Sequence, residues 1–418
     1  MVSKAALVAH RELQKANRFS NITTSTSVTS LGGPSLPEAT LHELSIEAAK
    51  FVECKLKKSR NYEFALRNLE LCPKLSLSDI ELGAVLGRGN FGIVTEIKRI
   101  QVGKKRIQRD QDDVHQEDHP CDPFSKGQES DLYAIKMLNQ KYCSDHQEFY
   151  MGIRDMAFEA HFLAAMDHPN VLKLRGLSQE SKGSKSFFLV MDRLYGTLKE
   201  RVEEWRCRQH LFSRGINKWL KPGAYKRNNR ELLETRLKVL KGLTGAVIYL
   251  HKQHIIDRDL KPENVGFDSA GHVKLFDFGL STEFDPSLPK PYKLTGMIGS
   301  LAFMAPEVYA STPYDESSDI YSLGLIFWKV MSLKPLFPHL TVNMLKDLVI
   351  TRGVRPVLES KWSESMRNLI GLMWDKNPKK RPNAQQIHDS LSQELERLDR
   401  SKNVPNNASC AFLLQLKK

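Results

Sequence analysis

The chain has 418 residues, of which 41% are hydrophobic and 27% are charged, and its formal net charge is +13. This is ordinary soluble composition with enough apolar material for a large core, and no apolar run approaches the roughly 20 residues that span a bilayer. The positive charge favours acidic partners. Because Lys and Arg are dispersed rather than gathered in one short motif, the sequence argues against a dedicated nucleic-acid function.

The cysteines and the first residues bear on the location of the protein in the cell. The six cysteines are scattered, with no Cys-x-x-Cys pair and no His cluster at metal-ligand spacing. We therefore expect a reduced protein of the cytoplasm or nucleus without structural zinc. Residues 1–19 carry four Lys and Arg residues against one Glu, a weak feature of organelle transit peptides, and a plain tail is the simpler interpretation.

Residues 1–75 are expected to form an N-terminal extension. Residues 21–39 are rich in Ser, Thr, Gly and Pro, which predicts a flexible linker. From residue 41 to residue 69 the apolar residues recur at helical spacing. This spacing predicts one or two short helices that pack beside the main domain.

The main domain begins with strand patterns and continues with helical ones. Residues 80–100 and 132–138 alternate apolar and polar side chains as half-buried strands do. The hydrophilic residues 104–131 interrupt them and predict an inserted surface loop. Residues 149–166 and 233–250 show the three- and four-residue apolar steps of helices packed on a core.

Residues 205–230 mix basic and aromatic side chains. This pattern fits the docking of acidic substrates, lipid headgroups or RNA. A solvated face is the simpler interpretation.

A glycine-rich turn at residues 86–94 lies between strand-like segments. Glycines let the backbone approach phosphate oxygens and present N–H groups to them. The Gly-x-Gly-x-x-Gly pattern alone also occurs in plain turns, and a dinucleotide-binding fold would need a helix directly after it. A strand follows instead, which favours a hairpin lid over phosphates. The candidate nucleotide-binding residues of this lid are Gly87, Arg88, Gly89, Asn90, Phe91, Gly92 and Val94.

The next strand ends in a lysine, at Tyr133-Ala134-Ile135-Lys136. Such a lysine is often a chance surface residue, but Glu159 lies on the helical pattern that follows. An ion pair between Lys136 and Glu159 would hold the ammonium group where it contacts the α- and β-phosphates of ATP.

Three further motifs follow in order: Asp257-Arg258-Asp259-Leu260-Lys261-Pro262-Glu263-Asn264, Asp277-Phe278-Gly279 and Ala305-Pro306-Glu307. With them the chain resembles the eukaryotic protein kinase family over about three quarters of its length. The resemblance implies an α+β, bilobal fold. We expect a small, mainly β N-lobe at residues 80–192, a larger α-helical C-lobe at 193–396 and a tail at 397–418.

The resemblance also implies an activity, the transfer of the γ-phosphoryl group of ATP to hydroxyl groups of protein substrates. Asp259 would position the substrate hydroxyl and accept its proton, and Lys261 would support the transferring group. Asn264 and Asp277 would hold Mg²⁺, a hard ion that prefers oxygen ligands. The adenine would lie among Val94, Ala134, Met191 as gate, and the hinge residues Asp192 to Leu194.

The motif around Lys261 and the pair Gly299-Ser300 imply serine/threonine substrates rather than tyrosine. Residues 353–356 and 372–382 resemble the C-terminal lobe of the tyrosine-kinase-like group. Two structural roles are implied as well. Arg381 would pair with Glu307, and Asp319 would anchor the catalytic loop.

Two positions depart from the family pattern. Asp257 stands where most kinases have His or Tyr, and since an unpaired buried carboxylate is costly, we expect it to be hydrogen-bonded, partly exposed or displaced. Gly266 stands where an aliphatic residue generally forms the floor of the adenine pocket. The pocket is expected to be roomier there, unless Phe267 or another side chain fills the space.

Two rival functions stay open. One is a pseudokinase scaffold that binds nucleotide without catalysis, and the other is a nucleic-acid-binding module with a kinase-like fold. A regulatory hypothesis concerns Thr295 or a neighbouring hydroxyl residue of the segment 277–307, which would be phosphorylated and bound by Arg258. An ordinary loop hydroxyl at Thr295 is an equal alternative.

Overall fold

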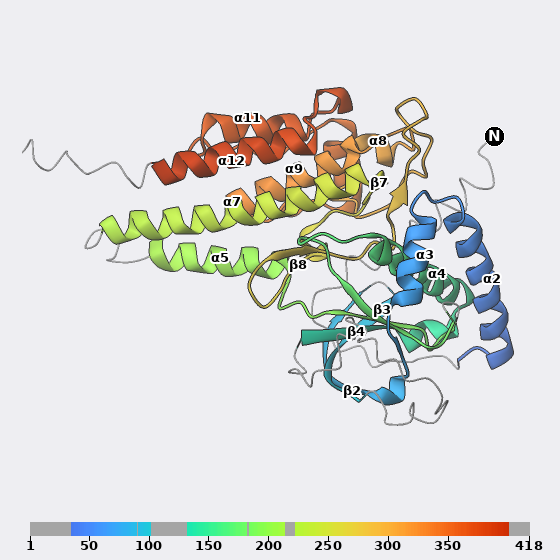
Figure 1. Ribbon diagram of the computed structural model, residues 1–418. Helices are drawn as coiled ribbons and strands as arrows, with labels where there is room; N and C mark the ends of the chain where they lie inside the picture. Colours follow the sequence, from blue (N-terminus) through green and yellow to red (C-terminus); the bar gives the residue numbers. More distant parts are fainter. Residues whose placement is uncertain (1–34, 90, 102–131, 182–183, 214–221, 401–418) are drawn as a thin grey trace, which may run out of the picture.

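A computed structural model describes residues 35–89, 91–101, 132–181, 184–213 and 222–400 (Figure 1). Several sequence features lie wholly or partly outside these residues. They are the basic N-terminal stretch 1–19, most of the linker 21–39, Asn90 of the glycine-rich turn, the insertion 104–131, residues 214–221 of the basic-aromatic segment, and the end of the tail from residue 401.

The N-lobe is built on a six-stranded sheet in the order β1-β5-β6-β4-β3-β2. Its strands run antiparallel except for the parallel pair of β1 and β5. The apolar residues that alternate along them form one core face around Ile97, Ile135 and Phe188. The strands are β1 Lys74–Leu75, β2 Ile80–Arg88, β3 Gly92–Ile100, β4 Tyr133–Leu138, β5 Leu174–Ser178 and β6 Phe188–Asp192.

Helix α4, His146–Ala165, packs against this sheet and is the long helix of the N-lobe (Figure 1). It starts where the sequence provides a cap, because the side chain of Asp145 accepts hydrogen bonds from the N–H groups of Gln147 and Glu148. Its buried residues include Phe149, Met156 and Glu159, so that a carboxylate enters a mainly apolar contact.

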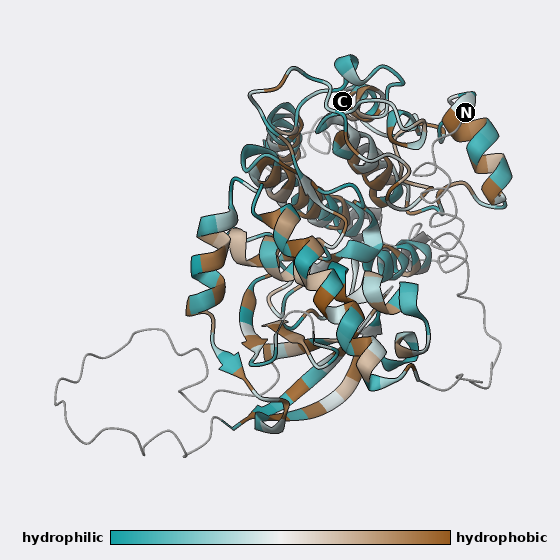
Figure 2. Cartoon of the chain, turned by 90° about the vertical axis from the view of Figure 1, so that its right-hand side faces the viewer, coloured by the Kyte–Doolittle hydropathy of each residue, from teal (hydrophilic) through white to brown (hydrophobic). Residues whose placement is uncertain are grey.

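The C-lobe is a stack of helices, with α12 lying along α7 (Figure 1). Figure 2 shows hydrophobic and hydrophilic residues alternating along the helices, as amphipathic periodicity requires. The longer helices are α5 Leu198–Ser213, α7 Pro222–Lys252, α9 Ser317–Ser332, α11 Glu364–Met373 and α12 Ala384–Arg400. Shorter turns of helix are α8 Pro306–Tyr309, α10 Val342–Met344, and the π-helical η6 Leu345–Thr351.

Two small sheets frame the segment between the lobes. Strand β7, Ile255–Ile256, pairs with β10, Thr282–Glu283, and β8, Val265–Phe267, pairs with β9, Val273–Leu275. The 3₁₀ turn η5, Pro262–Asn264, leads into β8. This arrangement places residues 257–264 and 277–279 next to each other. The mixed fold with a β N-lobe and a helical C-lobe confirms the predicted fold class.

The N-terminal residues add α2, Glu38–Leu56, and α3, Tyr62–Leu71, which both pack on α4 (Figure 1). Helix α2 has 19 residues and is longer than the short helix that the spacing predicts. Within the described ranges, no helix has both the length and the apolar character needed to cross a membrane.

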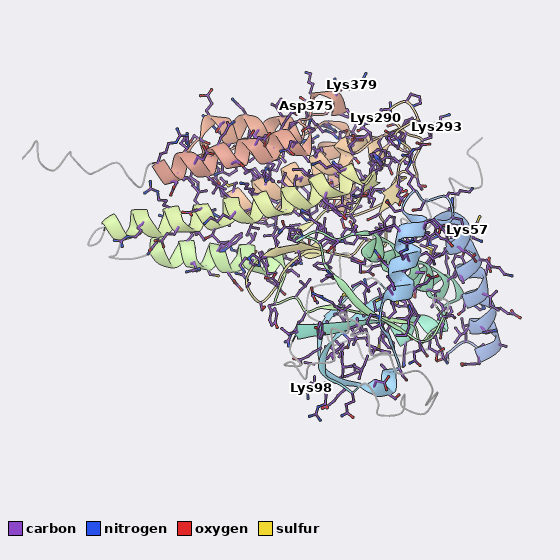
Figure 3. All side chains as sticks on the ribbon, viewed as in Figure 1. Lys57, Lys98, Lys290, Lys293, Asp375 and Lys379 are labelled. Carbon is purple, nitrogen blue, oxygen red and sulfur yellow. The ribbon has the colours of Figure 1, made fainter. Side chains whose placement is uncertain are left out.

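Basic side chains are spread over the described surface. Figure 3 labels Lys57 between α2 and α3, Lys98 on the N-lobe sheet, and Lys290, Lys293 and Lys379 on the C-lobe. The positive charge among these residues is therefore distributed over both lobes.

Candidate active site

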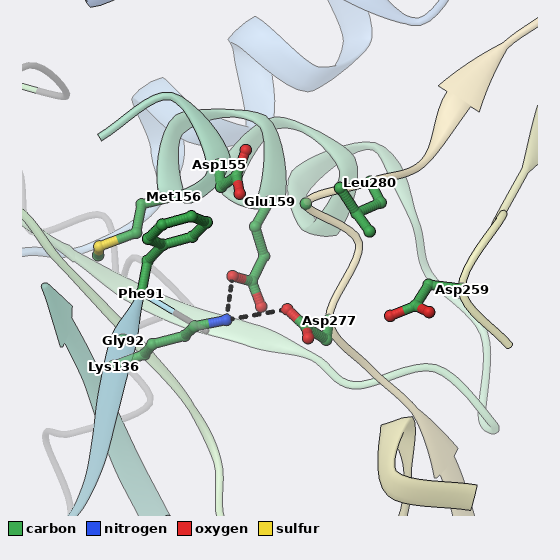
Figure 4. Close-up of a pocket in the computed structure, with 10 residues that line it drawn as sticks. Phe91, Gly92, Lys136, Asp155, Met156, Glu159, Asp259, Asp277 and Leu280 are labelled. Atoms are coloured by element: carbon green, nitrogen blue, oxygen red, sulfur yellow. Dashed lines mark hydrogen bonds and ion pairs between the residues drawn. The ribbon is translucent and has the colours of Figure 1, made fainter. Parts of the chain in front are cut away.

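Lys136 lies at the centre of a cluster of charges (Figure 4). Its Nζ is 2.5 Å from the Oε2 of Glu159 on α4 and 3.2 Å from the Oδ1 of Asp277. Burial alone would lower the pKa of Lys136, but the carboxylates of Asp277 and Glu159 outweigh it and raise that pKa. Burial likewise favours a raised pKa for Asp277, but the cations Lys136 and Lys261 hold it below its ordinary value. The cluster therefore contains a fixed cation and an ionised aspartate.

Asp259 is held by donors on both carboxylate oxygens. Its Oδ2 accepts hydrogen bonds from the Nζ of Lys261 at 2.6 Å and the Nδ2 of Asn264 at 3.2 Å, and its Oδ1 accepts the N–H of Ser300 at 2.8 Å. Lys261 also donates to the hydroxyl of Ser300 at 3.1 Å. The residue is only 5% exposed. These bonds fix the orientation of the carboxylate that the sequence assigns to proton transfer.

The backbone of this segment has left-handed conformations at two non-glycine residues, with φ of 69° at both Arg258 and Asp277. Such conformations cost of order 1–3 kcal/mol and persist where the surroundings determine them. Here Asp319 accepts the backbone N–H groups of Asp257 and Arg258, each at 3.0 Å. The prediction that Asp319 anchors the catalytic loop is confirmed.

The glycine-rich turn closes the site from the side of the sheet. Gly87 and Arg88 at the end of β2 pair with Val94 and Ile93 of β3. A Cβ at Gly92 would lie 3.0 Å from the Cε of Lys136, so a larger residue would press on that side chain. Phe91 also lines the pocket, beside Met156 in Figure 4, and its ring packs edge-on against Tyr142 at 5.5 Å.

The adenine candidates lie on adjoining strands and on the hinge. Ala134 pairs with Met191 across β4 and β6, and both are buried. The carboxylate of Asp192 is engaged by Arg175, at 2.6 and 3.1 Å. The side chain of Asp192 is thus occupied, and the backbone N–H groups of Asp192 and Arg193 donate to the carbonyl oxygens of Lys173 and Leu132.

Gly266 faces the side chain of Leu194. A Cβ built at Gly266 would lie 2.6 Å from the Cδ1 of Leu194 and 3.3 Å from its Cβ. The stated exception to the expectation of a roomier pocket therefore applies, because another side chain lies in that space. Leu194 from the hinge takes the space that an aliphatic residue at position 266 would take, and not Phe267.

Asp257 is 2% exposed, and its Oδ1 accepts the N–H of Asp259 at 3.0 Å. Its Oδ2 has no hydrogen-bond partner among the described residues. Burial, with the neighbouring carboxylates of Asp319 and Asp259, raises the pKa of Asp257 well above its ordinary value. Of the three expectations for this residue, hydrogen bonding is confirmed for one oxygen only.

The guanidinium of Arg258, which is expected to bind a phosphate, is engaged by backbone carbonyl oxygens in the structure. It donates to the carbonyl oxygens of Leu280 at 2.6 Å and Ser281 at 3.4 Å. Thr295 is exposed, and its carbonyl oxygen accepts the hydroxyl of Tyr314 at 2.7 Å. Phosphorylation of Thr295 stays a prediction.

Sequence reasoning missed Asp155, which lines the same pocket as Lys136, Glu159, Asp259 and Asp277. Burial raises the pKa of Asp155 to about 7. The missed signal is spacing, because Asp155 stands four residues before Glu159 and so lies on the same face of α4.

The predicted metal ligands can be tested against the requirements of Mg²⁺. In the part of the chain that the structure describes, no cluster of three or more His, Cys, Asp or Glu side chains suits a metal. Mg²⁺ bound with a nucleotide needs fewer protein ligands, since it keeps waters and takes phosphate oxygens. Among the described residues, neither the Oδ1 of Asn264 nor the Oδ2 of Asp277 takes part in a hydrogen bond or ion pair. Two oxygen donors thus remain, and the pair fits such an ion.

Comparison with known proteins decides the family. Residues 124–391, well over half of the chain, match the model of the protein kinase domain. The chain belongs to the protein kinase family. The match begins after β2 and β3, yet these strands join the same sheet as β4, so the glycine-rich turn is part of the kinase N-lobe.

The curated relatives are protein kinases of moderate similarity. A probable LIM domain-containing serine/threonine-protein kinase of Dictyostelium discoideum is 28% identical over 272 residues, 65% of this chain and 37% of that protein. A probable myosin light chain kinase of the same organism is 30% identical over 255 residues, 60% of this chain and 46% of that protein. Sperm motility kinase 2B of Mus musculus is 29% identical over 256 residues, 61% of this chain and 45% of that protein. The chain covers less than half the length of each of these relatives.

Proposed function

We propose that this protein kinase uses ATP to phosphorylate serine and threonine side chains of protein substrates. The observation that carries the proposal is the position of the Asp259 carboxylate. It is held by Lys261, Asn264 and the Ser300 N–H and lines one pocket with Lys136 and Asp277. The groups that phosphoryl transfer needs for the nucleophile and for the phosphates thus converge.

Each of these side chains has a distinct task in the proposed reaction. Asp259 orients the substrate hydroxyl and accepts its proton, and the ammonium group of Lys261 stabilises the charge on the transferring group. Lys136, fixed by Glu159, holds the α- and β-phosphates. Asn264 and Asp277 would hold Mg²⁺, which supplies neutralisation of the phosphate charge.

The preference for serine and threonine is supported by two observations. Lys261 and Ser300, two residues from which the sequence predicts serine/threonine substrates, are joined by a hydrogen bond beside Asp259. Among the relatives, the LIM domain-containing protein is named a serine/threonine kinase.

The test is a peptide phosphorylation assay with ATP and Mg²⁺, using peptides that differ only in a central Ser, Thr or Tyr. Wild type is expected to phosphorylate the Ser and Thr peptides, while Lys136→Met and Asp277→Asn lose activity by about 100-fold or more. Equal transfer by wild type and both variants would contradict the assignment of these residues. Phosphorylation of the Tyr peptide alone would contradict the specificity.

A nucleotide-binding scaffold without catalysis is the second candidate, because Asp257, a buried acid whose Oδ2 has no hydrogen-bond partner among the described residues, lies next to Asp259. Calorimetric titration with ATP and Mg²⁺ separates the two functions. A scaffold would bind nucleotide and transfer no phosphate to any peptide, whereas the enzyme does both.

A further inference from the structure

The loop between α2 and α3, residues 57–61, is built around the carboxylate of Glu283; we name residues 57–61 the clamp loop. Three donors reach this carboxylate. The hydroxyl of Ser59 donates to Oε1 at 2.7 Å, the backbone N–H of Arg60 to Oε2 at 2.9 Å, and the Nδ2 of Asn61 to Oε1 at 3.1 Å. Such charge-assisted bonds are about twice as strong as neutral ones.

Glu283 belongs to β10 and stands six residues after Asp277, the predicted metal ligand. The clamp loop makes further bonds on this side. The guanidinium of Arg60 pairs with Asp285 at 2.8 Å, and the Nδ2 of Asn61 is 3.4 Å from the carbonyl oxygen of Gln253. Asp285 and Arg60 are about half exposed, so this outer pair adds less than the inner one.

The same N-terminal unit holds α4, the helix that carries Glu159. Val52 and Leu56 of α2 share a buried cluster with Ala157 of α4. The Nδ2 of Asn68 on α3 donates to the carbonyl oxygen of Ala164 at 2.7 Å, in the last turn of α4. Figure 1 shows α2 and α3 lying along α4 at the side of the N-lobe. Residues 38–71 are thus fixed to α4.

His161 links the two sets of contacts. Its Nε2 lies 3.3 Å from the hydroxyl of Ser59, and its ring stacks on Tyr62 at 6.3 Å. His161 stands two residues after Glu159 on α4. Ser59 of the clamp loop therefore contacts both His161 of α4 and Glu283 of β10.

We propose that Glu283 is a positioning residue for phosphoryl transfer, acting through the clamp loop to keep α4 and its Glu159 against Lys136. This rests on the proposed kinase function. The physical basis is that Glu159 and Asp277 lie on separate elements that meet at Lys136. The clamp loop ties α4 to β10, which follows Asp277 in the chain, so that loss of the tie lets α4 move away from Lys136.

The test compares Glu283→Gln with Glu43→Gln, the same substitution at an exposed residue of α2, in the full chain. In Glu283→Gln the negative charge is lost and one acceptor oxygen becomes an NH₂ donor, which opposes one of the donors of the clamp loop. Amide hydrogen exchange in α4 is expected to quicken about fivefold or more in Glu283→Gln and to stay unchanged in Glu43→Gln. In the peptide assay, kcat is expected to fall about three- to tenfold in Glu283→Gln.

Two variants of Ser59 separate positioning from general stability. Ser59→Ala removes the hydroxyl donor and is expected to quicken exchange in α4, while Ser59→Thr keeps the donor and is expected to restore slow exchange. Unchanged exchange in α4 for both Glu283→Gln and Ser59→Ala would overturn the proposal. A uniform rise of exchange over the whole chain would also overturn it, since that indicates lost stability.

The exchange measurement does not depend on catalysis. It can therefore distinguish a failure of the proposed kinase activity from a failure of the positioning role of Glu283. A chain that transfers no phosphate but shows the α4 response refutes the kinase activity and leaves the tie intact. A chain that transfers phosphate with unchanged kcat in Glu283→Gln refutes the positioning role alone.

Discussion

At the scale of single residues, Asp257 is the feature that most distinguishes this site. It is buried between two other aspartates, and one of its oxygens lacks a partner among the described residues. Its raised pKa means that the folded protein binds this proton more tightly than the unfolded chain does. The free energy of unfolding therefore falls as pH rises from the ordinary carboxyl range near 4 toward the folded-state pKa of Asp257.

Asp257→Asn removes this titration. An amide at this position keeps an acceptor for the N–H of Asp259 and carries no charge to desolvate, so we expect the variant to be more stable than wild type at pH 8 by about 1–2 kcal/mol. The gain should shrink at pH 5. Urea unfolding at the two pH values measures it, with the exposed Asp389→Asn as control. A variant less stable than wild type at pH 8 would show that the charged form of Asp257 is stabilising.

A side chain at position 266 would overlap the side chain of Leu194, so we predict the effects of a single and a double substitution at these positions. Gly266→Leu should displace Leu194 from the hinge and raise the KM for ATP about three- to tenfold, because the new side chain overlaps Leu194. The double variant Gly266→Leu with Leu194→Ala should recover most of the loss. Steady-state kinetics at varied ATP concentration measures both. Equal KM values for wild type and Gly266→Leu would contradict the contact.

At the scale of elements, Arg381 joins α8 to the helices of the C-lobe. Its side chain is 0% exposed and forms a bidentate ion pair with Glu307, as the sequence predicts. The Nη1–Oε1 and Nη2–Oε2 distances are 2.5 and 3.0 Å. It also donates to the carbonyl oxygens of Ser317 and Asp375.

Arg381→Met should therefore cost about 3–5 kcal/mol, since Glu307 would remain buried without its partner. Arg400→Met breaks a pair that is 82% and 63% exposed and should cost less than about 1 kcal/mol. Urea unfolding of the two variants compares them. Similar losses in both would contradict the role of burial.

The sequence predicted those parts of the site whose signals are local. The end of β4 at Lys136, the phase of α4 at Glu159 and the loop from Asp257 to Asn264 all carry short patterns. The sequence could not show that Leu194 fills the space beside Gly266. The two residues are 72 positions apart in the sequence, and the rotamer of Leu194 depends on packing. The tie between Ser59 and Glu283 spans 224 residues and has no spacing to reveal it.

At the scale of the whole molecule, the N-terminal helices α2 and α3 pack against the kinase domain. Helices α2 and α3 bury apolar side chains against α4, and the clamp loop reaches β10 beyond the N-lobe sheet. The boundary at residue 75 that composition suggests therefore separates segments that are packed together. Residues 80–396 alone would leave the apolar face of α4 without these helices.

The central claim is that Asp259 serves phosphoryl transfer from ATP. The most direct test measures transfer of the labelled γ-phosphate of ATP to a serine peptide by the full chain with Mg²⁺, beside Asp259→Asn and a parallel ATP-binding titration. We predict that wild type transfers phosphate, and that Asp259→Asn binds ATP with similar affinity but transfers phosphate about 100-fold more slowly or worse. Equal rates for wild type and Asp259→Asn would contradict the claim.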